Sequence, residues 1–150
     1  MAQKKVGNGN FNTLLKVMLK HDVNEVTVAA AAIKKNVIFL DARERNEYVV
    51  SHIKNAVYVG YDDFNVSRLI NVPKGSEIIV YCSIGKRSES ITQKLSKVGY
   101  GNVSNLYGGI FEWVNQGNSV VDVNNKQTNK IHAYGNFWGQ WLDKGEKVYN

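Results

Sequence analysis

The residues best suited to covalent chemistry lie between positions 77 and 88, where the sequence is EIIVYCSIGKRS. Cys82, the only cysteine among 150 residues, follows a short apolar run from Ile78 to Tyr81. Such a run predicts a strand that is buried on both faces. Because a helical pattern begins at Lys86, we expect the thiol at a tight turn between strand and helix, where ligands bind in parallel sheets.

This turn favours a thiolate. A helix N-terminus offers unpaired N–H groups and about half a positive charge. Gly85 permits a backbone in which successive N–H groups point inward, and Lys86 and Arg87 add two full charges. The alternative is an inert, buried cysteine that acts as a small apolar filler. A cysteine followed by Gly, Lys and Arg fits nucleophilic chemistry better, so we expect Cys82 to be reactive.

Segments typical of strands and helices alternate along the chain and predict the scaffold for this turn. We expect strands at residues 25–28, 37–40, 56–59, 78–81 and 103–107. Helical patterns surround them at residues 11–21, 29–35, 44–49, 62–70, 86–98 and 110–114. This order is typical of an α/β domain with a mainly parallel sheet. Residues 1–10 are polar, and we expect them to be mobile.

Composition excludes several classes of function. A hydrophobic content of 43% and a charged content of 21% are ordinary for one soluble globular domain. The net charge of +6 favours small anions, but the lysines are scattered, so we expect neither a nucleic-acid nor a membrane partner. No apolar run approaches the roughly 20 residues of a membrane span, and no signal peptide is evident, so we expect a cytoplasmic protein.

A single cysteine also limits the chemistry. It cannot form an internal disulfide, and it has no second thiol with which to complete a dithiol redox cycle. The sequence contains no cysteine–histidine cluster at the spacing of a metal site. We therefore expect the protein to work without a metal or a cofactor.

Four segments, in order, give residues 23–118 a resemblance to the rhodanese-homology domain, of the single-domain thiosulfate sulfurtransferase type. They are FLDARERNEY at 39–48, SHIKNA at 51–56, CSIGKRS at 82–88, and Gly108-Gly109 with Trp113. Ser51, Lys54 and Asn55 depart from the family pattern, in a turn away from the predicted site. Residues 1–22 are expected to form an N-terminal extension with one helix, and residues 119–150 a C-terminal aromatic extension.

The resemblance implies a five-stranded, mainly parallel sheet flanked by helices on both faces. It implies that Cys82 carries sulfur as a persulfide, from thiosulfate or a similar small anionic donor to a thiol or cyanide-like acceptor. The acceptor would be a protein or a small thiol. The residues that would bind the substrate are those of the loop after the cysteine, namely Ser83, Ile84, Gly85, Lys86, Arg87 and Ser88. Asp41, Arg43, Glu47 and His52 match scaffold positions of the family, so we expect them to be structural rather than catalytic.

Two other functions fit parts of the pattern. Some relatives of this fold are phosphatases or arsenate reductases, in which five residues separate the cysteine from an arginine. Here four residues separate Cys82 from Arg87, and the smaller ring suits a sulfur atom better than a phosphate. The other alternative is a non-enzymatic module that relays sulfur to a partner or docks on it.

The C-terminal extension contains Tyr134, Trp138 and Trp141 at the spacing of one helix face. Such a cluster could form an aromatic wall beside the thiol or a docking face for a partner. More often, aromatic residues of this kind pack back on their own domain. We expect the extension to pack on the core.

Overall fold

Five parallel strands form the central sheet of the computed structural model, in the order β1-β5-β4-β2-β3. They are β1 (Glu25–Thr27), β2 (Ile38–Asp41), β3 (Val57–Tyr58), β4 (Ile78–Tyr81) and β5 (Val103–Tyr107). β4 is the central strand, with Val80 paired to Leu40 on one side and Asn105 on the other. The predicted α/β class with a five-stranded parallel sheet is confirmed.

Helices cover both faces of this sheet, and the side chains of β4 alternate between them. Ile78 and Val80 pack in the core beneath α4 (Lys86–Lys97) and the 3-10 helix η1 (Val66–Leu69). Ile79 and Tyr81 pack in the opposite core, with α1 (Gly9–Met18), α2 (Val28–Ala32) and α5 (Gly109–Asn115). All four side chains are buried, which explains why the segment is an unbroken apolar run.

Two helices begin at side-chain caps that the sequence provides. Asn8 accepts a hydrogen bond from the Phe11 N–H at the start of α1. Glu44 and Glu47 form a reciprocal capping box at the start of α3 (Arg45–Val50). The helix predicted over residues 62–70 is shorter, because only η1 forms, and Asn65 caps it by accepting from the Ser67 N–H.

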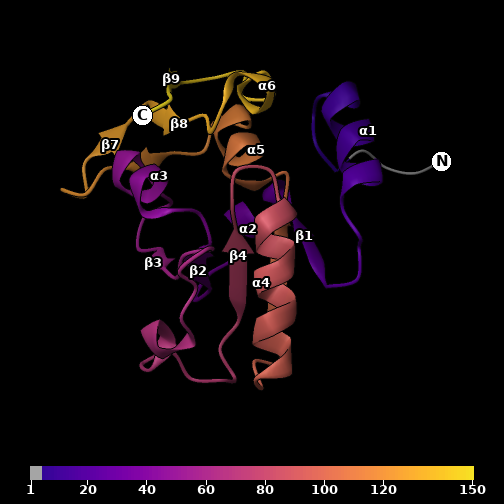
Figure 1. Ribbon diagram of the computed structural model, residues 1–150, viewed down its shortest axis with the longest axis vertical. Coiled ribbons are helices and arrows are strands. Elements are labelled where there is room, and N and C mark those ends of the chain that lie inside the picture. Colours follow the sequence, from indigo (N-terminus) through magenta and orange to yellow (C-terminus); the bar gives the residue numbers. More distant parts are fainter. Residues whose placement is uncertain (1–4) are drawn as a thin grey trace.

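The C-terminal segment adds two small sheets and a short helix. β6 (Val120–Val121) pairs antiparallel with β7 (Gln127–Thr128), and β8 (Lys130–His132) pairs parallel with β9 (Glu146–Val148). Between them lies α6 (Asn136–Gly139). Figure 1 shows this segment, in orange to yellow, on the side of the molecule toward which the β4 arrow points. It therefore lies near the strand ends where the thiol turn begins.

The structure describes residues 5–150. The predicted mobility of residues 1–10 thus lies partly outside the described residues. From Lys5 onward the segment is anchored, since Val6 is buried in the core and the Gly7 N–H donates to Glu112. Across residues 5–150, no helix is long and apolar enough to cross a membrane.

Candidate active site

Cys82 occupies the turn predicted for it. β4 ends at Tyr81 and α4 begins at Lys86, so four residues, Cys82 to Gly85, connect the central strand to the helix. Gly85, at the N-cap of α4, has φ 117°, a backbone conformation that residues with a Cβ rarely adopt. This conformation lets the Gly85 N–H donate to Cys82 Sγ at 3.2 Å. Cys82 is 1% exposed, so its sulfur lies at the bottom of the turn.

Ser88 and Asn105 support the thiol from behind. The Ser88 hydroxyl lies 3.4 Å from Cys82 Sγ and 2.6 Å from Asn105 Oδ1. The hydroxyl has one proton to donate, and the shorter distance indicates that it donates this proton to Asn105 Oδ1. The Asn105 side-chain amide also donates to the Gly85 carbonyl at 2.9 Å. Asn105 is fully buried on β5 and therefore fixes the loop from the neighbouring strand.

Arg87 is paired with Glu47 of α3. Its guanidinium donates two hydrogen bonds of 2.8 Å to the carboxylate and a third, of 3.0 Å, to Ser83 Oγ. Burial alone would lower the pKa of Arg87, but the hydrogen bonds with Glu47 raise it. Burial would likewise raise the pKa of Glu47, and the hydrogen bonds from Arg87 outweigh it, so the pKa is lowered. Both groups are ionised, and the pair braces the loop against α3.

The loop is also held by the start of α5. The Ile110 and Phe111 N–H groups donate to the carbonyls of Cys82 and Ser83 at 2.9 and 3.1 Å. Gly109 has φ 63°, and a Cβ at this position would lie only 2.4 Å from the Ser83 carbonyl oxygen. Only glycine allows α5 to approach this closely. This contact gives the Gly108-Gly109 signature a physical reason.

A pocket of about 190 Å³ opens above Cys82. Its lining comes from the predicted loop and from two other segments: Met18, Cys82, Ser83, Ile84, Lys86, Arg87, Tyr134 and Trp138. The Lys86 ammonium is exposed and donates to the Met18 carbonyl at 3.3 Å. The Tyr134 ring lies over the Arg87 guanidinium, 4.7 Å from ring centre to carbon. The walls are therefore mostly apolar, with one exposed cation at the rim.

The structure thus brings the predicted site residues together in two groups. Ser83, Ile84, Lys86 and Arg87 line the pocket with Cys82. Gly85 and Ser88 are buried and contact the thiol from inside the protein. The described residues contain no group of three potential metal ligands.

The residues expected to be structural lie around the turn rather than in the pocket. Arg43 donates two hydrogen bonds to Asp41, of 3.0 and 2.7 Å, and both residues are fully buried. Burial would lower the pKa of Arg43, but the Asp41 carboxylate raises it. The His52 ring stacks on Tyr48 at 3.8 Å, and its Nδ1 lies 3.0 Å from the Tyr48 carbonyl oxygen.

Several residues around the site were not predicted from the sequence. Asn105 had a recognisable signal, because it is a polar residue inside an apolar strand. The contact of Glu47 with the loop and the place of Met18 in the pocket wall depend on how distant elements pack. For Trp138, the sequence allows an aromatic wall beside the thiol but favours packing on the core. Of the C-terminal aromatic residues, Trp141 stacks on Phe11 at 5.5 Å, whereas Tyr134 is 51% exposed and contributes to the wall.

Known proteins with similar sequences include sulfurtransferases. A thiosulfate:glutathione sulfurtransferase of Saccharomyces cerevisiae is 29% identical over 126 residues, 76% of this chain and 82% of the yeast protein. A sulfurtransferase of Allochromatium vinosum is 31% identical over 87 residues, 58% of this chain and 80% of the relative. A tRNA uridine(34) hydroxylase of Hamiltonella defensa is 33% identical over 63% of this chain, which spans about a quarter of that protein (26%).

Solved structures support the fold. A thiosulfate sulfurtransferase from Pseudomonas aeruginosa superposes with a TM-score of 0.62 at 20% identity, over 75% of this chain and 22% of that one. A rhodanese-like domain from Anabaena gives a TM-score of 0.55 at 26% identity, over 60% of this chain and 68% of that domain. The model of the rhodanese-like domain family matches residues 25–116. The chain therefore belongs to the rhodanese-like domain family.

Proposed function

We propose that this protein is a sulfurtransferase that carries sulfur as a persulfide on Cys82. The observation that carries the proposal is the placing of the only thiol in the chain at the base of a pocket, beside the N-terminus of α4 and the Gly85 N–H. These donors can stabilise negative charge on sulfur both before and after transfer. A carrier that depends on a free thiol fits a reducing compartment, and we place it in the cytoplasm.

The first half-reaction loads the enzyme. The Cys82 thiolate attacks the outer sulfur of thiosulfate, the sulfur–sulfur bond of the donor breaks, and sulfite leaves with the electron pair. The new bond leaves a terminal sulfur anion on Cys82, so the charge is balanced and no proton need move. Lys86 is exposed, and its charge can attract the dianion over several ångströms. Arg87 is already paired with Glu47, so its main part is to hold the loop.

The second half-reaction unloads the sulfur to an acceptor. A thiolate or cyanide attacks the terminal sulfur, and the Cys82 thiolate leaves. The name of the yeast relative gives thiosulfate as donor and glutathione as acceptor, and we propose the same pair here. The apolar walls formed by Met18, Ile84 and Trp138 limit the access of water to the persulfide. No metal or cofactor takes part in either step.

Intact-protein mass spectrometry tests this proposal. Incubation with thiosulfate should add the mass of one sulfur atom, and cyanide or a reducing thiol should remove it. Cys82→Ser should fold with an unchanged circular dichroism spectrum but neither gain the sulfur nor turn over. If the wild-type protein stays unmodified with every sulfur donor and instead hydrolyses an aryl phosphate, it is a phosphatase, and the argument from the four-residue loop is wrong.

A further inference from the structure

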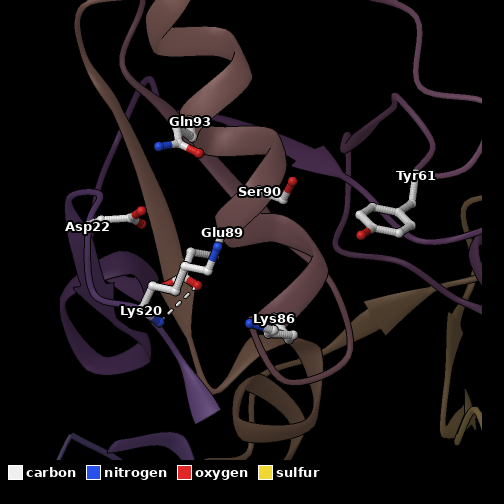
Figure 2. Close-up of a pocket in the computed structure, with 7 residues that line it drawn as sticks. All are labelled: Lys20, Asp22, Tyr61, Lys86, Glu89, Ser90 and Gln93. Atoms are coloured by element: carbon white, nitrogen blue, oxygen red, sulfur yellow. Dashed lines mark hydrogen bonds between the residues drawn. The ribbon is translucent and has the colours of Figure 1, made fainter. Parts of the chain in front are cut away.

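A second pocket, of about 200 Å³, lies along the exposed side of α4. Its lining is polar and comes from three segments: Lys20 and Asp22 after α1, Tyr61 after β3, and Lys86, Glu89, Ser90 and Gln93 of α4. Figure 2 shows Lys86, Glu89, Ser90 and Gln93 along the helix, with Lys20 and Asp22 on one side and Tyr61 on the other. Apart from Lys86, none of these residues takes part in the sulfurtransferase chemistry derived above.

Glu89 gives the pocket a fixed wall. It is 3% exposed, and its two carboxylate oxygens accept the N–H groups of Lys20 and His21 at 3.0 and 2.9 Å. The bond to Lys20 is the dashed line in Figure 2. Hydrogen bonds to a charged group are stronger than those between neutral groups. The segment that carries Lys20 and Asp22 is therefore held against α4 before any ligand arrives.

Lys86 lines both this pocket and the one above Cys82, so the two pockets are neighbours with the Lys86 side chain at their boundary. Its bond to the Met18 carbonyl places it over the chain that leads from Met18, in the first pocket, to Lys20, in the second. Pockets that hold drug-sized ligands begin at roughly 300 Å³. Each pocket alone is smaller than this, whereas the two together are large enough. One ligand that spans both would use the whole space.

The charges on the second pocket are mixed and free. Lys20 and Lys86 are cationic, and Asp22 and Glu89 are anionic. Glu89 accepts two backbone N–H groups, and none of the other three residues forms an ion pair in the described part of the chain. Ser90 and Gln93 add neutral groups that can both donate and accept hydrogen bonds. The lining is therefore complementary to a molecule with carboxylate and ammonium groups rather than to an anion alone.

We infer that the two neighbouring pockets together bind a zwitterionic, peptide-like thiol as the sulfur acceptor, with its thiol above Cys82 and its charged body in the second pocket. The carboxylate pairs with the exposed Lys20 and Lys86 on the solvent side of the buried Glu89, and the ammonium faces Asp22. The acceptor thiolate attacks the terminal sulfur of the Cys82 persulfide, forming a persulfide on the acceptor, and the Cys82 thiolate leaves with the electron pair. This inference rests on the proposed function and assigns it an acceptor subsite.

The test compares three thiols as acceptors for protein already loaded with sulfur: glutathione, N-acetylglutathione, which lacks the ammonium, and uncharged 2-mercaptoethanol. Lys20→Gln and Asp22→Asn should each lower kcat/KM for glutathione about two- to fivefold, the range expected for one exposed ion pair. Asp22→Asn should not lower the value for N-acetylglutathione, because its partner is absent. Neither variant should lower the value for 2-mercaptoethanol.

Lys35→Gln and Asp143→Asn are matched controls, since both residues are exposed and line neither pocket. The inference is overturned if Lys20→Gln and Asp22→Asn affect glutathione no more than these controls, or if they affect all three thiols equally. Discharge to a protein thiol alone, with no small thiol active, also overturns it. Failure of the wild type to gain sulfur at all would refute the proposed function instead, and the mass measurement separates the two results.

Discussion

At the scale of single residues, the site is stabilised by paired charges. Asp41 accepts two hydrogen bonds from the side chain of Arg43. Glu47 accepts two from Arg87, whose side chain is only 14% exposed. Removing one partner of a buried ion pair costs about 3–5 kcal/mol, because the other charge is left uncompensated. We therefore assign Arg87 to the geometry of the loop, Arg43 to the scaffold around Asp41 and Ser51, and the recognition of anions to exposed Lys86.

His132 is a second buried group next to the site. It is 4% exposed, and its Nδ1 accepts the N–H of Tyr134, a non-glycine residue with φ 69°. Burial lowers the pKa of His132, as do the nearby charges of Arg43 and Arg87, while Glu47 acts in the opposite direction. Neutral His132 thus keeps Tyr134 in place over Arg87.

This arrangement predicts a loss of stability in acid. The folded state keeps His132 neutral below the unfolded pKa of about 6.5, so the unfolded state binds more protons, and stability falls as pH drops through this range. His132→Asn retains an acceptor for the Tyr134 N–H but cannot titrate. The free energy of unfolding in urea, measured from pH 7.5 to 5, should therefore fall less in this variant than in the wild type.

His21→Asn is a control, because the effect of His21 on stability should change with pH in the opposite direction to that of His132. The Lys16 carbonyl raises the pKa of His21, burial opposes it, and Glu25 raises it further. The contribution of His21 to the free energy of unfolding is fully present below its unfolded pKa and is lost as pH rises through its folded pKa. The variant should thus lose stability at the acidic end of the range only. Equal pH profiles for His132→Asn and the wild type would contradict the assignment.

At the scale of elements, the thiol turn depends on α5 as much as on β4 and α4. Gly109 and Gly117 both have positive φ, but a Cβ at Gly109 would collide with the Ser83 and Cys82 carbonyls, whereas one at Gly117 would meet nothing within 4 Å. Substitutions at the two positions therefore distinguish the cost of backbone strain, which both share, from the cost of a steric collision, which only Gly109 has.

Gly117→Ala should cost about 1–2 kcal/mol in the free energy of unfolding, from the left-handed backbone alone. Gly109→Ala should cost about 1–3 kcal/mol more, because α5 must move away from the loop. It should also reduce sulfur loading per folded molecule, which Gly117→Ala should not. Urea unfolding and mass spectrometry measure the two effects, and equal costs would mean that α5 does not hold the loop.

The elements show how far the sequence alone can lead. The apolar run of Ile78 to Tyr81 and the turn after it were enough to predict β4, the place of Cys82 and the start of α4. The 3-10 helix η1 replaced a longer predicted helix because local caps compete with helical periodicity. Asn105 could have been singled out as a polar residue in a buried strand, but its partners Ser88 and Gly85 follow only from strand order.

At the scale of the whole molecule, the segments outside the family match are part of one structure with the domain. Ile131, Ala133 and Leu142 are buried, and Trp141 stacks on Phe11, so the C-terminal segment contributes to the core. Trp138 packs against the same core and also lines the pocket above Cys82, whereas Tyr134 is half exposed and lines only the pocket. The sequence pattern does not show which of these aromatic residues pack on the core and which line the pocket, because helical spacing does not say which neighbour covers each face.

Truncation after Asn129 should lower the Tm by more than about 5 °C, since several buried apolar side chains are lost. Sulfur loading from thiosulfate per folded molecule should survive, because Glu47, Asn105 and α5, which hold the loop, remain. Tyr134→Ala is the companion variant, as it alters the wall without removing core packing, and its Tm should stay close to that of the wild type. A large loss of loading at unchanged Tm would instead place the segment within the donor site.

The origin of the pocket walls has a consequence for how such proteins diverge. The Cys82 loop, which we propose carries the sulfur, belongs to the matched domain, whereas Met18, Tyr134 and Trp138 lie before and after residues 25–116. Under the proposed function, mutation in these outer segments can change the acceptor while the loop that carries the sulfur stays the same. Two proteins with the same loop can therefore use different acceptor thiols. The acceptor can change during evolution while the enzyme remains active throughout.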